Sequence, residues 1–329
     1  MRRFRQYRTT QAVRDHWADV PEPRPQDFIY PYFVVEGCGV KEEIGTMKDV
    51  FRYSIDTLLE DIGELTALGI NKVLLFGVIA QEKKDEQGSL AYSPDSIVAR
   101  AVRAVKGAFP QVTVMTDVCL CGYTSHGHCG IISTICQSDV NNDATLPLLA
   151  EMAYQHALAG ADFVAPSAMM DGQVEAIRRR LDSDERTWNT RIMGYSAKYA
   201  SAFYGPFRDA AHSAPGFGDR RSYQMDYRTR NQGLEEIEAD ISEGADWVMV
   251  KPAMAYLDII ERATERFAGH PMVAYQVSGE YSMLMNAARE GLFDEWQIFH
   301  ESLTAIRRAG AQYIISYYAK RYAFLASKH

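Results

Sequence analysis

The chain alternates between two kinds of segment, and this alternation limits its fold more than any other feature of the sequence. Eight short runs are almost continuously apolar and rich in β-branched and aromatic residues, a pattern typical of strands buried on both faces. The eight runs cover residues 28–36, 72–78, 113–120, 163–168, 191–197, 247–252, 272–278 and 313–319. Segments with helical periodicity lie between them, for example at 54–69, 95–109, 145–160 and 233–246. Several of these end in glycine, which commonly follows the last turn of a helix.

Strand–helix alternation repeated about eight times in 329 residues predicts an α/β fold, a (β/α)8 TIM barrel. A doubly wound parallel sheet is the alternative that shares this alternation. No G-x-G-x-x-G or Walker motif follows an early apolar run, which weakens that alternative. In a barrel, the chemistry is expected at the carboxyl ends of the strands.

Two segments fall outside the alternation. Residues 1–26 end in three closely spaced prolines, which stop a helix, and we interpret them as an extended N-terminal arm outside the barrel domain of residues 27–329. The aromatic side chains of Phe4, Tyr7 and Trp17 suggest that this arm packs on another subunit. Residues 204–232 are long, non-periodic and rich in arginine, and a loop of this kind in a compact domain is typical of an active-site lid.

The composition excludes several classes of protein. The formal net charge of −8 argues against a general nucleic-acid or membrane-surface binder, because both need a positive field. No stretch approaches the roughly 20 apolar residues of a membrane span, and the basic N-terminus leads into no apolar segment of a secretory signal. Five cysteines, with Cys38 and Cys136 far from the other three, do not resemble a disulfide framework. We therefore expect a protein of the reducing cytoplasm.

Reactive side chains follow most of the later apolar runs. They are Asp117, Cys119, Cys121, Ser167, Lys198, Lys251, Ser278 and Tyr317. A single lysine at a strand end more often extends its ammonium group into water. Two lysines on adjacent predicted strands favour another interpretation, because each charge lowers the proton affinity of the other amine. A free amine can attack a carbonyl group to form a Schiff base, so Lys198 and Lys251 are candidate nucleophiles.

Cys119, Cys121 and Cys129 form the spacing C-x-C-x₇-C, which can bring three thiolates to one metal ion, and zinc is the common cytoplasmic metal that thiolates favour. His126 or His128 could supply a fourth ligand, which would make the site structural. An open fourth position would make it catalytic. The spacing leaves both open, and three unligated thiols are disfavoured because they invite oxidation.

Other polar residues suggest how a substrate could be bound. Asp117 precedes the cysteines and, beside a metal and two lysines, could move a proton. In the lid, Arg208, Arg220, Arg221 and nearby Gln224 are candidates for gripping a carboxylate. Hydroxyl groups at two further strand ends, Ser278 and Tyr317, could bind a second carboxylate. For each of these residues the plain alternative is a solvated or hydrogen-bonded surface position.

Six motifs in this order resemble the porphobilinogen synthase family, also called 5-aminolaevulinate dehydratase. They are DVCLCGYTSHGHCG, VAPSAMMDG, SAKYASAFYGPFRDA, GDRRSYQMD, VMVKPAMAYLDI and VAYQVSGEYSM, and the resemblance runs from about residue 27 to 319. It implies a TIM barrel whose arm wraps a neighbouring subunit in a homo-octamer. The implied reaction condenses two molecules of 5-aminolaevulinate to porphobilinogen with loss of two waters, an early step of tetrapyrrole (haem) synthesis.

The resemblance also implies a role for each matching residue. Lys251 corresponds to the lysine that forms a Schiff base with the substrate giving the propionate side of the product, and Lys198 to the lysine holding the other substrate. Asp117 corresponds to the carboxylate that assists proton transfer. The three cysteines correspond to the ligands of a catalytic zinc in zinc-dependent members, which demotes His126 and His128. The implied substrate-binding residues are Arg208, Arg220, Gln224, Ser278, Tyr317, Ser167 and Tyr275.

The sequence departs from the family pattern at a few positions. Gly122 stands where many relatives have proline, which should only loosen the loop. Glu236 matches a glutamate that approaches an allosteric magnesium ion in some relatives, but Ala168 and Gln173 replace the Asp and Arg that support its water shell. We therefore expect weak or absent activation by magnesium.

The residues themselves, without the resemblance, leave two rival functions open. A class I aldolase would also use a barrel lysine, but it needs neither a second lysine nor a thiol cluster. A zinc-storage or regulatory module would use the thiol cluster but neither lysine. Formation of a pyrrole from 5-aminolaevulinate, measured together with zinc content, distinguishes all three.

Overall fold

The computed structural model describes residues 1–135 and 139–328, so Cys136 lies outside the described residues. Within them, eight parallel strands form a closed barrel in chain order, and the last strand pairs with the first. The barrel strands are β1 (Phe28–Val35), β4 (Lys72–Val78), β5 (Thr113–Val118), β6 (Phe163–Pro166), β7 (Arg191–Lys198), β8 (Trp247–Lys251), β9 (Met272–Gln276) and β10 (Tyr313–Ser316). The expected TIM barrel is confirmed. Each strand begins at the residue that the sequence predicted. The strands are visible in the sequence because a strand buried on both faces needs a continuous apolar run.

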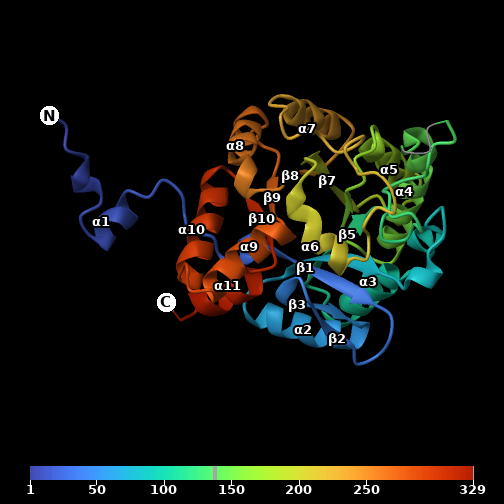
Figure 1. Cartoon of the computed structure of the whole chain (residues 1–329), viewed down its shortest axis with the longest axis horizontal. Coiled ribbons are helices and arrows are strands. Elements are labelled where there is room, and N and C mark those ends of the chain that lie inside the picture. Colours follow the sequence, from blue (N-terminus) through green and yellow to red (C-terminus); the bar gives the residue numbers. More distant parts are fainter. Residues whose placement is uncertain (136–138, 329) are drawn as a thin grey trace.

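Helices surround the strands on all sides of the barrel (Figure 1). They are α2 (Ile55–Ala67), α3 (Ile97–Ala108), α4 (Asn142–Leu158), α5 (Gln173–Asp182), α6 (Gly205–Ala210), α7 (Gln232–Ser242), α8 (Leu257–Arg266), α9 (Ser278–Arg289), α10 (Glu295–Arg308) and α11 (Ala319–Ala326). Short 3₁₀ turns complete the connections at η2 (Pro25–Asp27), η3 (Gln81–Lys83), η4 (Ser89–Tyr92), η5 (Ala202–Tyr204) and η6 (Met254–Tyr256). None of the described helices combines the length and the apolar character needed to cross a lipid bilayer.

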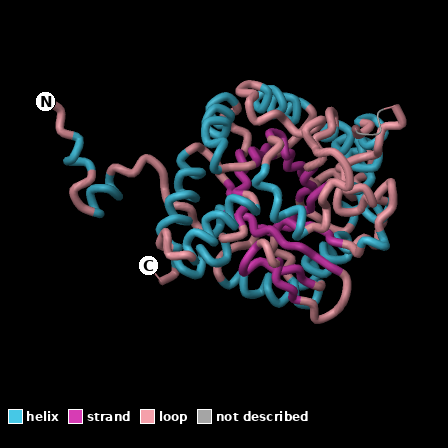
Figure 2. Tube along the Cα trace, viewed as in Figure 1, coloured by secondary structure: helices cyan, strands magenta, loops and turns pink. Residues whose placement is uncertain are grey.

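The N-terminal residues extend away from the barrel (Figures 1 and 2). They contain η1 (Phe4–Tyr7) and α1 (Gln11–His16), whose N-cap Thr10 accepts a hydrogen bond from the backbone N–H of Val13. Tyr7 packs edge-on against Trp17, with ring centroids 4.7 Å apart, yet Trp17 remains 56% exposed. This segment therefore buries little of its aromatic surface within one chain.

A hairpin that the sequence did not predict extends the sheet beside β1. Its strands are β2 (Lys41–Ile44) and β3 (Met47–Tyr53), which are antiparallel to each other, and β3 also pairs with the end of β1. The first three residues of β2 are exposed and charged or polar, so the segment lacks the apolar character of the barrel strands. The hairpin lies outside the closed ring.

Aromatic side chains close the amino-terminal end of the barrel. Phe163, Trp247 and Tyr313 are the first residues of β6, β8 and β10, and their rings contact one another in a row, with centroids 4.5 and 4.2 Å apart. The guanidinium carbon of Arg191 lies 4.1 Å from the Phe163 ring, and the Lys72 amine lies 5.1 Å from the Tyr313 ring. Aromatic pairs contribute about 0.5–1.5 kcal/mol each beyond their buried area. This end is packed for stability, which leaves the opposite end for chemistry.

Candidate active site

The two lysines lie side by side at the carboxyl end of the barrel. Lys198 is the last residue of β7 and Lys251 the last residue of β8, and the two are direct partners in the parallel register. Both are almost fully buried, at 6% and 5% exposure. Neighbouring strands are about 4.8 Å apart, so the two side chains start from adjacent points of one rim.

An extra residue in β7 produces this alignment. Gly194 pairs with Val248 and Ala197 pairs with Val250, so three steps along β7 lie opposite two steps along β8. Without this β-bulge, continued pairing from Gly194 would place Lys198 opposite Pro252. Only glycine fits at position 194 beside this bulge, because a Cβ atom there would lie only 2.5 Å from Oδ2 of Asp240 on α7. Bulges commonly re-aim side chains next to active sites, and this one brings the two amines together.

Aromatic rings surround the amine of Lys251. The Nζ atom lies 4.2 Å from the ring centroid of Tyr275 and 5.1 to 5.3 Å from those of Tyr195, Tyr204 and Phe207. Burial and, to a lesser extent, the positive charge of Lys198 lower the pKa of Lys251 to about 7, against the opposing effect of Asp117. A substantial fraction of Lys251 is therefore the nucleophilic free amine at neutral pH.

Lys198 has a different neighbour. Its Nζ donates a hydrogen bond to the backbone oxygen of Ser167, directly after β6. Asp117 on β5 is the third charged group of this rim, and burial raises its pKa to about 6 while a hydrogen bond from Ser167 and the two lysines oppose the rise. The structure thus brings Asp117, Ser167 and both lysines together, as the sequence predicted.

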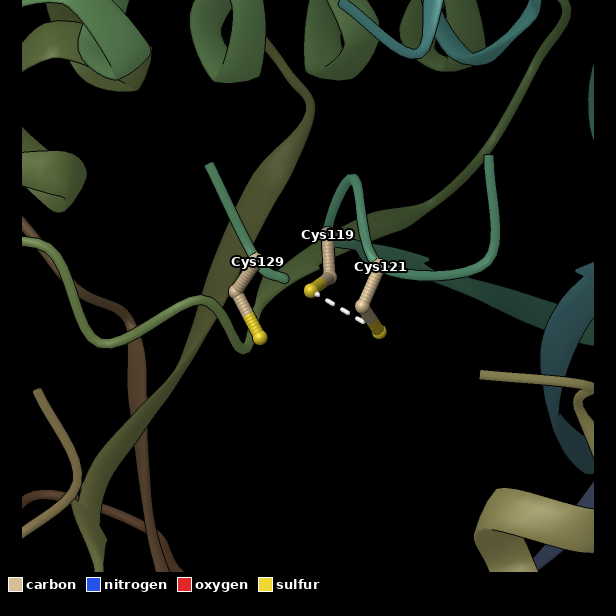
Figure 3. A group of neighbouring side chains, drawn as sticks. All are labelled: Cys119, Cys121 and Cys129. Atoms are coloured by element: carbon tan, nitrogen blue, oxygen red, sulfur yellow. Dashed lines mark hydrogen bonds between the residues drawn. The ribbon is translucent and has the colours of Figure 1, made fainter. Parts of the chain in front are cut away.

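The three clustered cysteines converge on one point (Figure 3). Their Sγ atoms all lie within 4.8 Å of one another, and all three side chains are buried. The Cys119 thiol lies 3.3 Å from the Cys121 sulfur. Hydrogen bonds from Cys119 and Cys121 lower the pKa of Cys129 well below its usual value, and the charges of Arg220 and Lys198 add to this. This donor set fits a thiophilic metal ion, which binds thiolate and not thiol.

The two histidines of the cysteine loop are not free to bind a metal. His128 Nε2 lies 3.0 Å from the Phe217 oxygen, which can only accept, so Nδ1 accepts from the Tyr223 hydroxyl at 3.1 Å. His126 likewise donates from Nε2 to the Glu86 oxygen, while its Nδ1 accepts the backbone N–H of His128. Burial lowers the pKa of both rings, which favours these neutral forms. The side chains of this loop that could hold a metal ion are therefore the three cysteines.

Both histidines belong instead to a platform for the second half of the lid. The backbone N–H of Gly216 donates to the His126 oxygen, and Arg220 donates to the Gly127 oxygen. The lid approaches so closely that a Cβ atom on Gly127 would lie 2.3 Å from the Ala214 oxygen. The sequence had offered these histidines only as candidate metal ligands or loop residues, because the identity of a side chain does not reveal the distant backbone that contacts it.

Lid residues present unpaired polar groups to one pocket. Arg208, Arg220 and Gln224 all line it, and Arg220 and Gln224 are buried. The Nε atoms of both arginines and both side-chain polar atoms of Gln224 are buried without a hydrogen-bond partner. Unsatisfied buried donors are costly, so their convergence indicates a binding site for an anion. Arg221 differs, since it is exposed and pairs with Asp219 at 3.5 Å.

The second set of hydroxyls lies near Lys251, whose amine is 4.2 Å from the ring centroid of Tyr275. Tyr275 and Tyr317 are buried, and their hydroxyl oxygens are 2.9 Å apart. Ser278, the first residue of α9, accepts the backbone N–H of Phe207 and donates to the Phe203 oxygen. Ser278 therefore also holds the beginning of the lid, which the sequence did not predict.

A buried carboxylate that sequence reasoning missed fixes the turn after Lys251. Glu280 accepts the backbone N–H groups of Ala253, Met254 and Val277 at 3.3, 2.7 and 2.9 Å. It links the end of β8 to the amino terminus of α9. The sequence feature that could have identified Glu280 is its third position in α9, where glutamate commonly accepts free backbone N–H groups.

Two of the residues considered for magnesium, Gln173 and Glu236, line another pocket together with Asp240 and Glu243. Burial raises the pKa of Glu236, and Gln232 donates to its carboxylate at 3.4 Å. Ala168 is buried and offers no polar atom. Among the described residues, only the three cysteines bring three ligand atoms within 4.8 Å of one another.

Comparisons with known proteins agree on one family. The family model described as delta-aminolevulinic acid dehydratase matches residues 1–325. Curated relatives of that name include those of Halalkalibacterium halodurans, 49% identical, and Methanothermobacter thermautotrophicus, 50% identical, each aligned over 97% of this chain and 95% of the relative. The solved delta-aminolevulinic acid dehydratase of Toxoplasma gondii, in complex with the reaction product porphobilinogen, is 42% identical. It superposes with a TM-score of 0.95 over 99% of this chain and 91% of that chain.

Proposed function

Because the chain belongs to the delta-aminolevulinic acid dehydratase family and is therefore a lyase, we propose that it condenses two molecules of 5-aminolaevulinate to porphobilinogen with loss of two waters. The observation that carries this proposal is the pairing of Lys198 and Lys251 in register beside three converging thiols. Two amines at one rim can hold two keto substrates at once. Fixing both converts a bimolecular condensation into an intramolecular one.

Each lysine would form a Schiff base with one substrate. The free amine adds to the ketone carbon, and the carbonyl oxygen then leaves as water. Lys251 would hold the substrate giving the propionate side, as its match to the family motif implies, and its lowered pKa leaves a free amine at neutral pH. Lys198 would hold the substrate giving the acetate side. Each protonated imine then acidifies the neighbouring C–H bonds.

Two differently built sites would distinguish the two substrate carboxylates. The unpaired groups of Arg208, Arg220 and Gln224 suit the carboxylate of the substrate on Lys198. The hydroxyls of Ser278 and Tyr317 would bind the carboxylate of the substrate on Lys251, and Tyr275 orients Tyr317 through its 2.9 Å hydrogen bond. Identical molecules are then sorted by a charged site and a neutral site.

Asp117 would exchange protons during these steps. Its pKa of about 6 lies close to neutrality, so it can both accept and release a proton. Ser167 supports it through a hydrogen bond and holds the Lys198 amine through its backbone oxygen.

We propose zinc as the metal held by Cys119, Cys121 and Cys129, because all three ligands are thiolates. When bound, such an ion supplies Lewis-acid chemistry beside the substrate on Lys198. Glu236 would be the residue nearest any regulatory magnesium, but with Ala168 and Gln173 in place we expect weak or absent activation. Titration of magnesium into metal-stripped, zinc-restored enzyme tests this, and a large saturable gain would contradict it.

The arm, residues 1–26, would serve assembly into a homo-octamer in the cytoplasm. Its half-exposed aromatic side chains support this role, because a partner subunit would remove them from water. Deleting these residues should lower the assembly state. An unchanged elution volume on gel filtration would contradict the proposal.

One assay tests the proposed reaction. The purified protein is incubated with 5-aminolaevulinate, and the pyrrole is measured with Ehrlich reagent before chelation, after chelation and after zinc restoration. We expect pyrrole formation that is lost on chelation and returns with zinc. Imine trapping without any pyrrole would favour an aldolase, and bound zinc without trapping would favour a storage role.

A further inference from the structure

The hairpin β2–β3 contacts the lid through one buried arginine. Arg52 on β3 is 6% exposed, although it stands on a hairpin outside the closed ring of strands. Its Nε donates to the Ala210 oxygen at 2.9 Å and one terminal nitrogen donates to the Asp209 oxygen at 3.0 Å. Its other terminal nitrogen forms an ion pair at 3.2 Å with Glu42, an exposed residue of β2. The guanidinium therefore joins the hairpin to the carboxyl end of α6.

The contact is chemically specific. The last carbonyl groups of a helix have no partner within the helix and carry partial negative charge. Arg52 satisfies two of them with one planar group, and hydrogen bonds from a charged donor are stronger than neutral ones. Thr46, between the two strands of the hairpin, adds a hydrogen bond from its hydroxyl to Oδ2 of Asp209 at 2.8 Å.

The hairpin is itself held by the barrel. The Tyr281 hydroxyl donates to the Lys48 oxygen at 2.6 Å, and the Ser282 hydroxyl donates to the Thr46 oxygen at 3.0 Å. Both donors belong to α9, the helix that begins at Ser278. The hairpin is thus a fixed support from which Arg52 reaches the lid.

The helix that Arg52 holds carries two residues of the site. Phe207 lies 5.3 Å from the Lys251 amine, measured to its ring centroid, and packs edge-on against Phe76. Arg208, the next residue, lines the lid pocket, and its buried Nε has no hydrogen-bond partner. A helix of six residues is not stable by itself, so contacts outside it must set its position.

We propose that Arg52 is a positioning residue, which acts through the carboxyl end of α6 to hold Arg208 and Phe207 at the substrates. The kinetic part of this inference rests on the proposed function. Arg52 touches neither lysine nor the pocket that would take the carboxylate. Its loss should leave the amines intact and loosen the lid.

The variants Arg52→Met and Arg52→Lys test the proposal, with Glu42→Gln as the matched control. Methionine fills similar space without a donor, and lysine keeps the charge but not the planar group that reaches two carbonyls. Glu42→Gln removes the ion-pair partner of Arg52 without touching the lid. Circular dichroism and thermal unfolding establish that each variant is folded.

Limited trypsin digestion measures how loosely the lid is held, because trypsin cleaves after arginine and Arg208, Arg220 and Arg221 lie within the lid. Cleavage sites and rates are followed by mass spectrometry without substrate. We expect cleavage after these arginines about tenfold faster in Arg52→Met, two- to fivefold faster in Arg52→Lys, and within twofold of wild type in Glu42→Gln. Equal rates in wild type and Arg52→Met would overturn the proposal. If Arg52→Met does not fold, a wild-type rate in Arg52→Lys overturns it.

Kinetics with 5-aminolaevulinate supply the second measurement. Arg52→Met should raise KM about tenfold or more while lowering kcat less, and borohydride trapping at Lys251 should persist. A fall in kcat with unchanged KM would count against positioning of the carboxylate-binding lid. If the wild type forms no pyrrole, the proposed function fails, and the digestion result still decides the role of Arg52.

Discussion

Lys198 and Lys251 are the same residue at the same height of neighbouring strands, but their surroundings differ. Lys198 donates to a backbone oxygen beside Asp117. Lys251 instead faces four aromatic rings, and its pKa falls to about 7 mainly through burial. Identical residues thus acquire different reactivity from neighbours supplied by other strands and the lid. If the two lysines hold the two substrates as proposed, this difference would set their order of binding.

The largest effect should come from replacing the more reactive amine. Lys251→Met removes the nucleophile while keeping an apolar side chain of similar length, so porphobilinogen formation should fall by at least about 10⁴-fold. A rate assay with Ehrlich reagent measures the loss. If the variant keeps more than one hundredth of wild-type activity, Lys251 is not essential, and the proposed difference between the two lysines is wrong.

Lys198→Met should also disable the reaction, by roughly 10³-fold, but it should spare the first step. Borohydride with 5-aminolaevulinate should still attach one substrate mass, mapped to Lys251 by peptide mass spectrometry. Under the same conditions Lys251→Met should show slower labelling. Equal labelling of the two single variants would mean that their surroundings do not set the order.

The pH dependence of trapping at Lys251 sharpens the same contrast. Below its pKa of about 7 the amine is protonated and has no lone pair, so the trapping rate should fall about tenfold per pH unit and level off above it. Lys198→Met removes a neighbouring positive charge and should move the midpoint to higher pH. Asp117→Asn removes a negative charge and should move it to lower pH. Midpoints that do not move in these opposite directions would contradict the electrostatic explanation.

The smallest effect should come from replacing an aromatic ring beside the Lys251 amine. Tyr275→Leu removes the ring that lies 4.2 Å from the Lys251 amine, and an aromatic contact to a cation is worth about 0.5–2 kcal/mol. We expect a loss of about tenfold in kcat/KM. Tyr275→Phe keeps the ring and loses only the hydrogen bond to Tyr317, so it should lose about threefold. A larger loss of kcat/KM in Tyr275→Phe than in Tyr275→Leu would assign the effect to the hydroxyl group and not to the ring.

Much of the barrel was predictable because the apolar runs report burial on both faces directly. The residues at the strand ends were predictable for the same reason, since a strand assigned correctly places its last residues at the rim. Asp117, Lys198 and Lys251 came together on that basis, and the three cysteines did so because they share one short loop.

Features that depend on pairing between distant segments were not predictable. The hairpin β2–β3 has exposed, charged residues and looks like a loop until its pairing with β1 is known. Glu280 resembles an ordinary helix-terminal glutamate, although it fixes the turn after Lys251. From the sequence, His126 and His128 could equally be metal ligands or loop residues. Only their contacts with the backbone of the lid distinguish the two possibilities.

The bulge in β7 implies that the alignment of the two amines depends on how the strands pair, and not only on which residues they carry. Side chains alternate across a strand, so if the same residues of β7 continued the regular pairing from Gly194, Lys198 would stand opposite Pro252 and point away from Lys251. An irregularity in a strand usually only interrupts its pairing, but here one extra residue brings the second amine of the proposed condensation into line with the first.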